Sequence, residues 1–288
     1  MSPCRREKGE TPRPCFLLVA ATVMEMRASI ARLPCFLPVS IPDMSRRLPS
    51  FHLLPALELP AFTIRLLVCG VGPVAAALSL GMLLGEPAAA AHPLRGIVNI
   101  GLAGAYDPRA TPPGSLVLAS GECLPEYGVW PDKGEDVAAA AHGDGGGGRP
   151  LPLPLPQACL NGREIFNSLE LDPEAALGNM GLTCHTAGKA LSRGVSLTVA
   201  GVSGTPGRAR RLASLFNGLI ENMEGFPLAL GALRAGIPFV EIRAVSNVAG
   251  LRPPHGWDLP GALDALELAG TILFGEDKAV RRLTDLTV

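Results

Sequence analysis

The chain has 288 residues, which is enough for one large α/β domain or two small ones. Hydrophobic residues make up 48% of it and charged residues 18%, and the formal net charge is −1. This balance gives no indication of a nucleic-acid partner. No segment approaches the roughly 20 consecutive apolar residues of a membrane-spanning helix, so no membrane partner is expected either.

The first apolar run, CFLLVAATVM, begins at Cys15 behind several basic residues, as it would in a secretory signal. Glu25 and Arg27 argue against a signal, because they lie between this run and the small residues at 29–31, where charges are disfavoured. A buried parallel strand followed by a loop and a helix explains the pattern better. Residues 1–14 would then be a loose leader.

Apolar runs of strand length alternate with Ala- and Leu-rich helical stretches along the rest of the chain. Strands are predicted at 62–70, 96–104, 114–122, 194–204, 218–224 and 239–245, and helices at 73–85, 208–216, 225–236 and 259–275. This alternation predicts one α/β domain over 15–276, with a central mixed, mostly parallel sheet flanked by helices on both faces. Residues 132–157 carry a Gly run and a Pro–Leu alternation, which predicts a flexible insertion. Residues 277–288 are assigned to a tail.

Cysteine and histidine usage indicates the compartment and the metal content. The seven cysteines are dispersed without a CxxC pair, which is typical of reduced thiols in a cytoplasmic protein. The five histidines show no metal-ligand spacing, so no metal is expected.

The segment GVGPVA at 70–75 follows a predicted strand and opens a predicted helix, as the dinucleotide-binding fingerprint does. That fingerprint requires an acidic residue about 20 positions further on. The chain offers AAAAHPLRG there, without an acid, so an NAD-dependent oxidoreductase is disfavoured. The glycines then serve a tight turn and close helix packing.

Two polar residues interrupt apolar runs where predicted strands end. Glu224 lies between a strand and a helix, and Asn247 lies just past the strand 239–245, so parallel strands would place both at one edge of the sheet. Burying either group without a partner costs a few kcal/mol. A Glu224–Arg243 ion pair is one explanation. The other is a nucleoside, whose ribose hydroxyls a carboxylate binds and whose purine edge an amide binds.

The string NMEGFPLALGALRAGIPFVEIRAVSNVAG, at 222–250, resembles the nucleoside phosphorylase and nucleosidase superfamily. GVGPVAAA and NIGLAGA lie where that family has two glycine-bearing turns, and ATVMEM matches the end of its first strand, where the hydrolytic members keep a Glu. The resemblance covers about residues 15–270 and implies a nucleoside phosphorylase-like fold. Asn247 replaces the Asp of the methylthioadenosine/adenosylhomocysteine nucleosidases, which favours a 6-oxopurine. Together with Trp257, this is most similar to the members that hydrolyse futalosine to hypoxanthine in menaquinone biosynthesis.

The resemblance also implies a role for each site residue. Glu25 deprotonates the attacking water, Glu224 holds the ribose hydroxyls, and Asn247 stabilises the departing base. Further substrate contacts are expected from Met223, Gly201, Val202, Ala103 and Gly104, with Arg243 and Ser246 in support. The resemblance implies that no metal or organic cofactor is needed. It also implies a homo-oligomer, a dimer or larger, because members of this family commonly form such oligomers.

Three alternatives stay open at this point. The same fold could use phosphate as the nucleophile, could act on methylthioadenosine, or could bind a nucleoside without catalysis. The methylthioadenosine hydrolases have Ser where this chain has Leu102, so that side-chain contact is absent. The glycine-bearing turns supply no arginines of their own for a phosphate.

Overall fold

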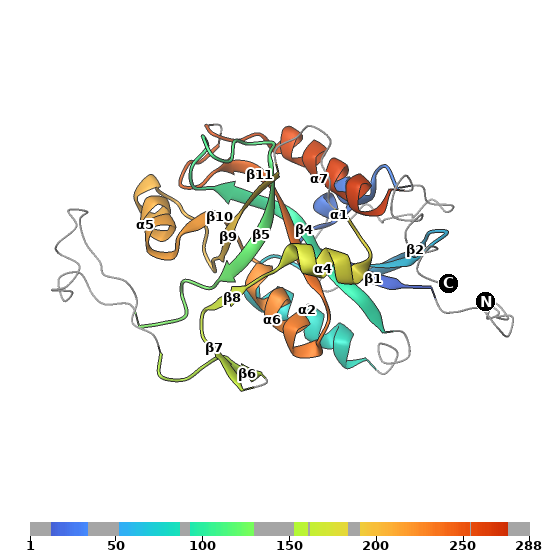
Figure 1. The fold of residues 1–288 in the computed structure, drawn as a ribbon. Helices are drawn as coiled ribbons and strands as arrows, with labels where there is room; N and C mark the ends of the chain where they lie inside the picture. Colours follow the sequence, from blue (N-terminus) through green and yellow to red (C-terminus); the bar gives the residue numbers. More distant parts are fainter. Residues whose placement is uncertain are drawn as a thin grey trace, which may run out of the picture.

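The computed structural model describes residues 13–33, 52–86, 93–129, 153–160, 162–183, 191–253 and 255–275 (Figure 1). The strands are β1 (Cys15–Ala20), β2 (His52–Glu58), β3 (Thr63–Val68), β4 (Leu94–Ala105), β5 (Leu116–Cys123), β6 (Ala158–Leu160), β7 (Arg163–Ile165), β8 (Ser168–Glu170), β9 (Leu191–Thr198), β10 (Gly218–Asn222) and β11 (Phe239–Val248). The helices are α1 (Val23–Ile30), α2 (Pro73–Gly85), α4 (Pro173–Met180), α5 (Pro206–Phe216), α6 (Gly225–Ala235) and α7 (Leu259–Phe274). The predicted leader, insertion and tail lie outside the described residues, except at 13–14 and 153–157.

The main sheet has nine strands and runs in the order β10-β9-β5-β11-β4-β1-β3-β2, with β8 added beside β5. Its centre is parallel, since β4 pairs in parallel with both β1 and β11. Antiparallel pairs join β11 to β5, β2 to β3 and β5 to β8. β10 also pairs with β4, antiparallel, so the sheet curls back on itself at that end. The sheet is therefore mixed, as predicted, and it is partly closed.

Alternate side chains of β1 enter two different hydrophobic clusters, because successive residues of a strand point to opposite faces. Phe16 and Leu18 pack with residues of α1 and α7, whereas Leu17 and Val19 pack with residues of α2 and α6. Figure 1 shows these two helix pairs on opposite sides of the central strands. β1 is buried from Phe16 to Ala20, which confirms the strand interpretation of the first apolar run.

Helix ends follow the local chemistry that the sequence provides. Thr22 and Glu25 form a capping box at the start of α1, which satisfies backbone N–H groups of its first turn. Gly236 ends α6 in the left-handed conformation, as the predicted C-terminal stop requires. The predicted helix 73–85 coincides with α2, whereas the predicted strand 194–204 ends earlier, at Thr198.

One irregularity lies in β11, beside β4. Val245 pairs with Ala103 and Asn247 pairs with Gly104, so Ser246 is an extra residue on the β11 side. This β-bulge locally increases the twist and re-aims the side chains that follow it. Asn247 therefore lies within β11, and not beyond the end of the strand as the sequence suggested.

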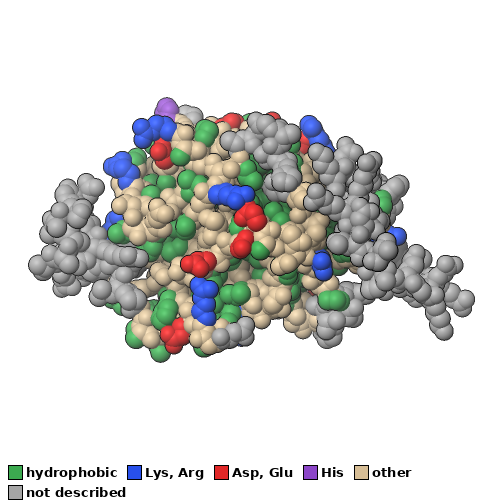
Figure 2. Space-filling model, viewed as in Figure 1, with side chains coloured by type: hydrophobic (Ala, Val, Ile, Leu, Met, Phe, Trp, Pro, Cys, Tyr) green, Lys and Arg blue, Asp and Glu red, His purple; other side chains and the backbone are tan. Residues whose placement is uncertain are grey.

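The described residues also show how charged side chains, helices and thiols are distributed. Lys and Arg side chains are scattered over the face shown in Figure 2 and do not gather into one stripe. Among the described helices none is long and apolar enough to cross a membrane. Cys15, Cys69 and Cys159 are free thiols.

Candidate active site

Glu25 is held at the start of α1 by bonds to both of its carboxylate oxygens. Thr22 donates to Oε2 from its backbone N at 2.8 Å and from its hydroxyl at 2.6 Å. The backbone N–H of Leu102, on β4, donates to Oε1 at 2.9 Å. Leu102 thus offers a main-chain donor, although it lacks the serine hydroxyl of the methylthioadenosine hydrolases. Glu25 is only 5% exposed, and its orientation is fixed by two separate elements.

Glu224 is the N-cap residue of α6 and is also buried. Its Oε1 accepts from the backbone N–H of Gly72 at 3.0 Å, and its Oε2 lies 3.4 Å from Arg243 Nη1. Gly72 can turn its N–H to this carboxylate because it has φ 100°, which favours glycine. The glycine-bearing turn before α2 therefore contacts a carboxylate, and the Glu224–Arg243 pair expected as one explanation is present.

The antiparallel pairing of β10 with β4 brings Glu224 and Glu25 to the same level of the sheet. Glu221 pairs with Gly104, so the residues after it run back along β4 toward Gly101. A β-carbon on Gly101 would lie 2.6 Å from Arg243 Nη1 and 2.9 Å from Glu25 Oε1. The expectation that parallel strands place Glu224 at the site is therefore wrong, since β10 opposes β4 and the reversed direction brings Glu224 there.

Asn247 lies at the other end of this stretch of β4, opposite Gly104. A β-carbon on Gly104 would lie 3.1 Å from Asn247 Nδ2. Three residues of a strand span about 10 Å, so the two carboxylates and the amide are separated by about the length of a nucleoside. The residues singled out in the sequence are thus arranged along one strand rather than in separate places.

Ser246 links Asn247 to β4. Its hydroxyl lies 3.0 Å from Asn247 Oδ1 and 3.3 Å from the carbonyl oxygen of Ala103. Asn247 Nδ2 donates to the carbonyl oxygen of Val248 at 3.2 Å. These bonds orient a half-buried amide, and its second N–H hydrogen can be donated to a base carbonyl.

The remaining predicted substrate contacts follow β9 and β10. Met223 is half-buried and packs with Leu197, Val199 and neighbouring residues. Gly201 and Val202 follow β9 and are exposed, and the carbonyl oxygen of Gly201 accepts from Arg208 at 2.8 Å. Ser203, in the same loop, is bonded to Glu221 through both its backbone N and its hydroxyl. The loop is therefore tied to β10, which also leads to Glu224.

Burial and charge set the ionisation of the central groups. Burial raises the pKa of Glu224, while Arg243 opposes the rise. Burial acts to lower the pKa of Arg243, but the charges of Glu241 and Glu224 raise it overall. Burial, reinforced by Glu224, raises the pKa of the Cys69 thiol to about 12, so this thiol stays protonated beside the site. Among the described residues no cluster of His, Cys, Asp and Glu could hold a metal ion.

The sequence reasoning missed the buried polar residues behind Glu224. Asn222 bonds both to Arg243 and to the first backbone groups of α6, and Glu122 and Glu241 lie beside it. A signal was available, because Glu122 and Glu241 each stand in an apolar strand, as Glu224 and Asn247 do.

Replacing Gly101 by alanine tests the close approach at this strand. The added β-carbon would displace the Arg243 guanidinium and the Glu25 carboxylate, and misplacing a reacting group by about 1 Å can cost about 100-fold. We expect kcat/KM to fall by about that factor. Gly178→Ala is the matched control, because its β-carbon meets open space on α4 and helix propensity favours it by up to about 1 kcal/mol. Wild-type turnover in Gly101→Ala would contradict the described geometry.

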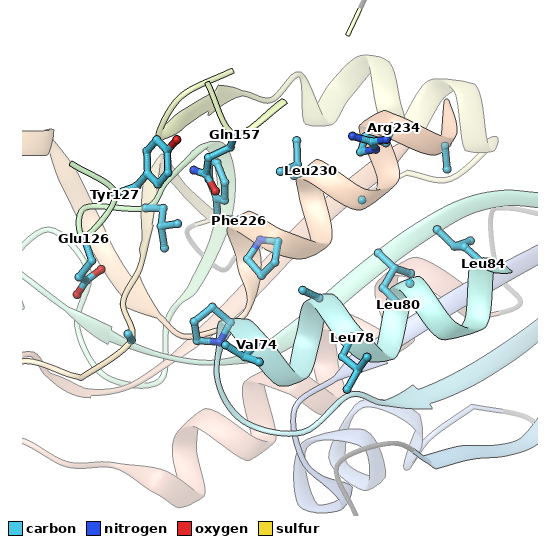
Figure 3. A pocket seen from close by; sticks show the side chains of 18 residues that line it. Val74, Leu78, Leu80, Leu84, Glu126, Tyr127, Gln157, Phe226, Leu230 and Arg234 are labelled. Carbon is cyan, nitrogen blue, oxygen red and sulfur yellow. The ribbon is translucent and has the colours of Figure 1, made fainter. Parts of the chain in front are cut away.

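A groove of about 1020 Å³ adjoins this site. Figure 3 shows it between α2, which contributes Val74 and Leu78, and α6, which contributes Phe226 and Leu230. These helices begin next to Gly72 and Glu224 respectively. The groove itself is lined by other residues than Glu25, Glu224 and Asn247 and is predominantly apolar.

Comparison with known proteins establishes the family. Residues 58–273 match the family model described as the Phosphorylase superfamily. The chain is 35% identical over 214 residues to futalosine hydrolase from Thermus thermophilus, covering 74% of this chain and 82% of that protein. It is 32% identical over 251 residues to futalosine hydrolase from Streptomyces coelicolor, covering 87% of this chain and 91% of that protein. The chain belongs to the Phosphorylase superfamily.

A solved structure shows the same fold. The 5′-methylthioadenosine/S-adenosyl homocysteine nucleosidase of Helicobacter pylori is similar with a TM-score of 0.59, covering 96% of this chain and 99% of that one. Its sequence identity is 15%, so the likeness concerns the fold alone. The predicted nucleoside phosphorylase-like α/β fold is confirmed.

Proposed function

We propose that this protein hydrolyses the N-ribosidic bond of futalosine, releasing hypoxanthine and dehypoxanthinyl futalosine in menaquinone biosynthesis. The observation that carries the proposal is the agreement of two relatives, both futalosine hydrolases, over 82% and 91% of their lengths. The placement of Glu25, Glu224 and Asn247 along β4 supports the same reaction. The protein is accordingly an N-glycosyl hydrolase.

Glu224 is proposed to bind the sugar. Each carboxylate oxygen has a protein donor in the structure and a further lone pair for a ribose hydroxyl. Arg243 and the Gly72 N–H keep the carboxylate in one orientation, so little side-chain entropy is lost when the sugar binds. Met223, next to Glu224, is proposed to pack against the sugar face.

Glu25 is proposed to activate the water. As the C1′–N bond breaks, its electron pair moves to the purine and the sugar becomes oxocarbenium-like. Water then bonds to C1′, and Glu25 takes its proton. The bonds from Thr22 and Leu102 hold the carboxylate close to Gly101, at the level of Glu224.

Asn247 is proposed to stabilise the leaving base. Its amide can donate to the 6-oxo group or N7 while negative charge builds on the purine, and such bonds strengthen toward the transition state. An amide is not a proton donor of the strength of a protonated Asp, so the base takes its proton from solvent. Ala103, Gly104, Gly201 and Val202 are proposed to line the rest of the base site.

Incubation with futalosine, inosine and methylthioadenosine, each with and without phosphate, tests the proposal by following base release. We expect hypoxanthine release from futalosine at a rate that does not depend on phosphate. A phosphate-dependent rate would instead indicate a phosphorylase, and release of adenine from methylthioadenosine would indicate the other nucleosidase class. Binding of futalosine without turnover would indicate a sensor.

The substitution Asn247→Asp tests recognition of the 6-oxo group. An aspartate lacks the amide donor and leaves a buried polar atom mispaired, which costs about 1–3 kcal/mol. We expect kcat/KM for 6-oxopurine nucleosides to fall relative to 6-aminopurine nucleosides by about 5- to 150-fold. Equal losses for both substrate classes would show that Asn247 does not read the base edge.

We further propose that the protein is a homo-oligomer that buries the face of α2. Val74, Leu78 and Met82 follow one another at helical spacing and are 80%, 60% and 50% exposed, which is unusual for side chains of this size. Val74 and Leu78 line the apolar groove shown in Figure 3, and Met82 lies one turn further along α2. A second copy covering this face would also approach the ends of α2 and α6 that carry the site. Sedimentation analysis tests this, and a monomer at enzyme-assay concentrations would contradict it.

The domain organisation and the cellular location of the protein are proposals as well. We propose that residues 15–276 are one catalytic domain whose helices cover both faces of the sheet, and that the protein works in the cytoplasm. The free thiols of Cys15, Cys69 and Cys159 support a reducing compartment. Fractionation of the source cells tests the location.

A further inference from the structure

Two carboxyl groups without a part in the proposed reaction are buried behind Glu224. Glu122, on β5, and Glu241, on β11, are 1% and 0% exposed. A β-carbon on Gly225, the first residue of α6, would collide with Glu122 Oε1 and with Glu241 Oε2. Both oxygens therefore lie against the same glycine, directly below the start of α6.

The two carboxyl groups lie side by side, because Asn222 Nδ2 donates to Glu122 Oε1 at 3.0 Å and to Glu241 Oε1 at 3.3 Å. Their other partners are all donors: Thr198 donates to Glu122 Oε2 at 2.6 Å, Asn99 donates to Glu241 Oε2 at 3.2 Å, and Arg243 Nε donates to Glu241 Oε1 at 3.0 Å. Two ionised carboxylates have no hydrogen to place between them, whereas one protonated carboxyl donates to its neighbour. One proton on the pair would therefore turn the repulsion between two adjacent carboxylates into a hydrogen bond.

The charge of the cluster also favours one proton. Glu224 and Glu241 each contact the Arg243 guanidinium, and Glu122 is buried beside Glu241. Three ionised carboxylates would leave two uncompensated negative charges in the interior, which is very costly. One proton reduces the excess to a single charge.

We propose that Glu122 and Glu241 share one proton, and that this pair is a positioning device that holds Glu224 in place for the sugar. Asn222 connects this pair of carboxyl groups to Glu224. Its Nδ2 donates to Glu122 Oε1 at 3.0 Å, and its Oδ1 accepts from the backbone N–H groups of Glu224 and Gly225 at 2.7 Å each. The carboxyl pair orients the amide, and the amide orients the turn that carries Glu224. This role rests on the proposed binding of ribose by Glu224.

Loss of the shared proton should disturb the turn between β10 and α6, which carries Glu224. Burial and the charge of Glu241 both raise the pKa of Glu122, so the proton is retained in the folded protein above the pH at which an exposed carboxyl loses it. The groups that face the pair from the surrounding elements are Asn99, Ser196, Thr198, Asn222, Glu224, Arg243 and, further off, Glu25. Deprotonation adds one more negative charge to this set and repels Glu224.

The sign of the pH effect on stability follows from the raised pKa. Between the pKa of an exposed carboxyl and that of Glu122, the folded state binds more protons than the unfolded state, so stability falls as pH rises. A glutamine at 122 keeps a neutral donor and acceptor but does not titrate. The unfolding temperature of Glu122→Gln minus that of the wild type should therefore increase as the pH rises above the pKa of an exposed carboxyl.

The experiment compares the wild type, Glu122→Gln and Glu170→Gln. Glu170 is on β8, next to β5, and its side chain is 92% exposed, so it is the matched control. In infrared spectra at neutral pH, the wild type and the control should show the carbonyl stretch of a buried protonated carboxyl, and Glu122→Gln should lose it. With futalosine, the KM of the wild type should rise at alkaline pH on the order of 10-fold, as for one lost hydrogen bond to a charged group. The KM of Glu122→Gln should rise much less, and kcat should change less than KM.

Absence of the infrared band in the wild type overturns the proposal, even if Glu122→Gln does not fold. An unchanged band in Glu122→Gln, or an alkaline rise in KM equal to that of the wild type, overturns it too. The infrared and unfolding measurements need no substrate. A failure of the proposed hydrolase activity is therefore distinguishable from a failure of the shared proton.

Discussion

Replacing Glu25 by glutamine is expected to lower kcat for futalosine by about 10²–10⁴-fold, the usual contribution of a general base. Glutamine can keep the capping box with Thr22, since the motif accepts Gln in the third position, so α1 should remain folded. The amide cannot take the proton of the attacking water. KM should change little, because Glu224 and Asn247 still bind sugar and base. Steady-state kinetics with hypoxanthine release as the readout measure both values.

Glu174→Gln is the control for that experiment. Glu174 is also an acidic residue in the first turn of a short helix, α4, but its side chain is 51% exposed and lies beside Arg193. We expect it to keep wild-type kinetics. Unchanged turnover in Glu25→Gln would mean that another group activates the water.

The second large effect is expected on stability. Arg243→Met should lower the free energy of unfolding by about 3–5 kcal/mol, because it removes the guanidinium that compensates Glu224 and Glu241 in the interior. For a domain of this size the unfolding midpoint should fall by about 10 °C. Calorimetry or thermal melts followed by circular dichroism measure the change.

An exposed arginine gives the comparison for Arg243. Arg109 lies 3.3 Å from Asp107, but its side chain is 91% exposed. Surface pairs contribute little, so Arg109→Met should change stability by less than about 0.5 kcal/mol. Equal midpoints for the two variants would show that the buried cluster does not depend on its guanidinium.

The sequence predicted most elements around the site because their local patterns are strong. α2, α6 and α7 begin and end where caps and glycines indicated, within one residue. β1 was recognised because it is buried on both faces and reads as a continuous apolar run. Short strands such as β6, β7 and β8 have three residues each, too few for a period to be recognised.

Strand direction and the buried acids could not be predicted from local patterns. The pairing of β10 with β4 depends on how the sheet curls in space, and an apolar strand reads the same in either direction. The neighbours of Glu122 in space are far away in the chain, and Asn222, for example, is 100 residues away. The sequence indicated that the polar residues needed partners, but only the fold shows which residues these are.

The extra residue in β11 has a consequence for altering base preference by mutation. Removing Ser246 would leave position 247 opposite Gly104, but it would remove the local twist of the bulge and the hydroxyl that bonds to Asn247 Oδ1. We expect a protein without Ser246 to keep Glu25 and Glu224 in place but to bind the purine more weakly. Libraries aimed at new bases should therefore vary the identity of residue 247 while leaving the length of this strand untouched.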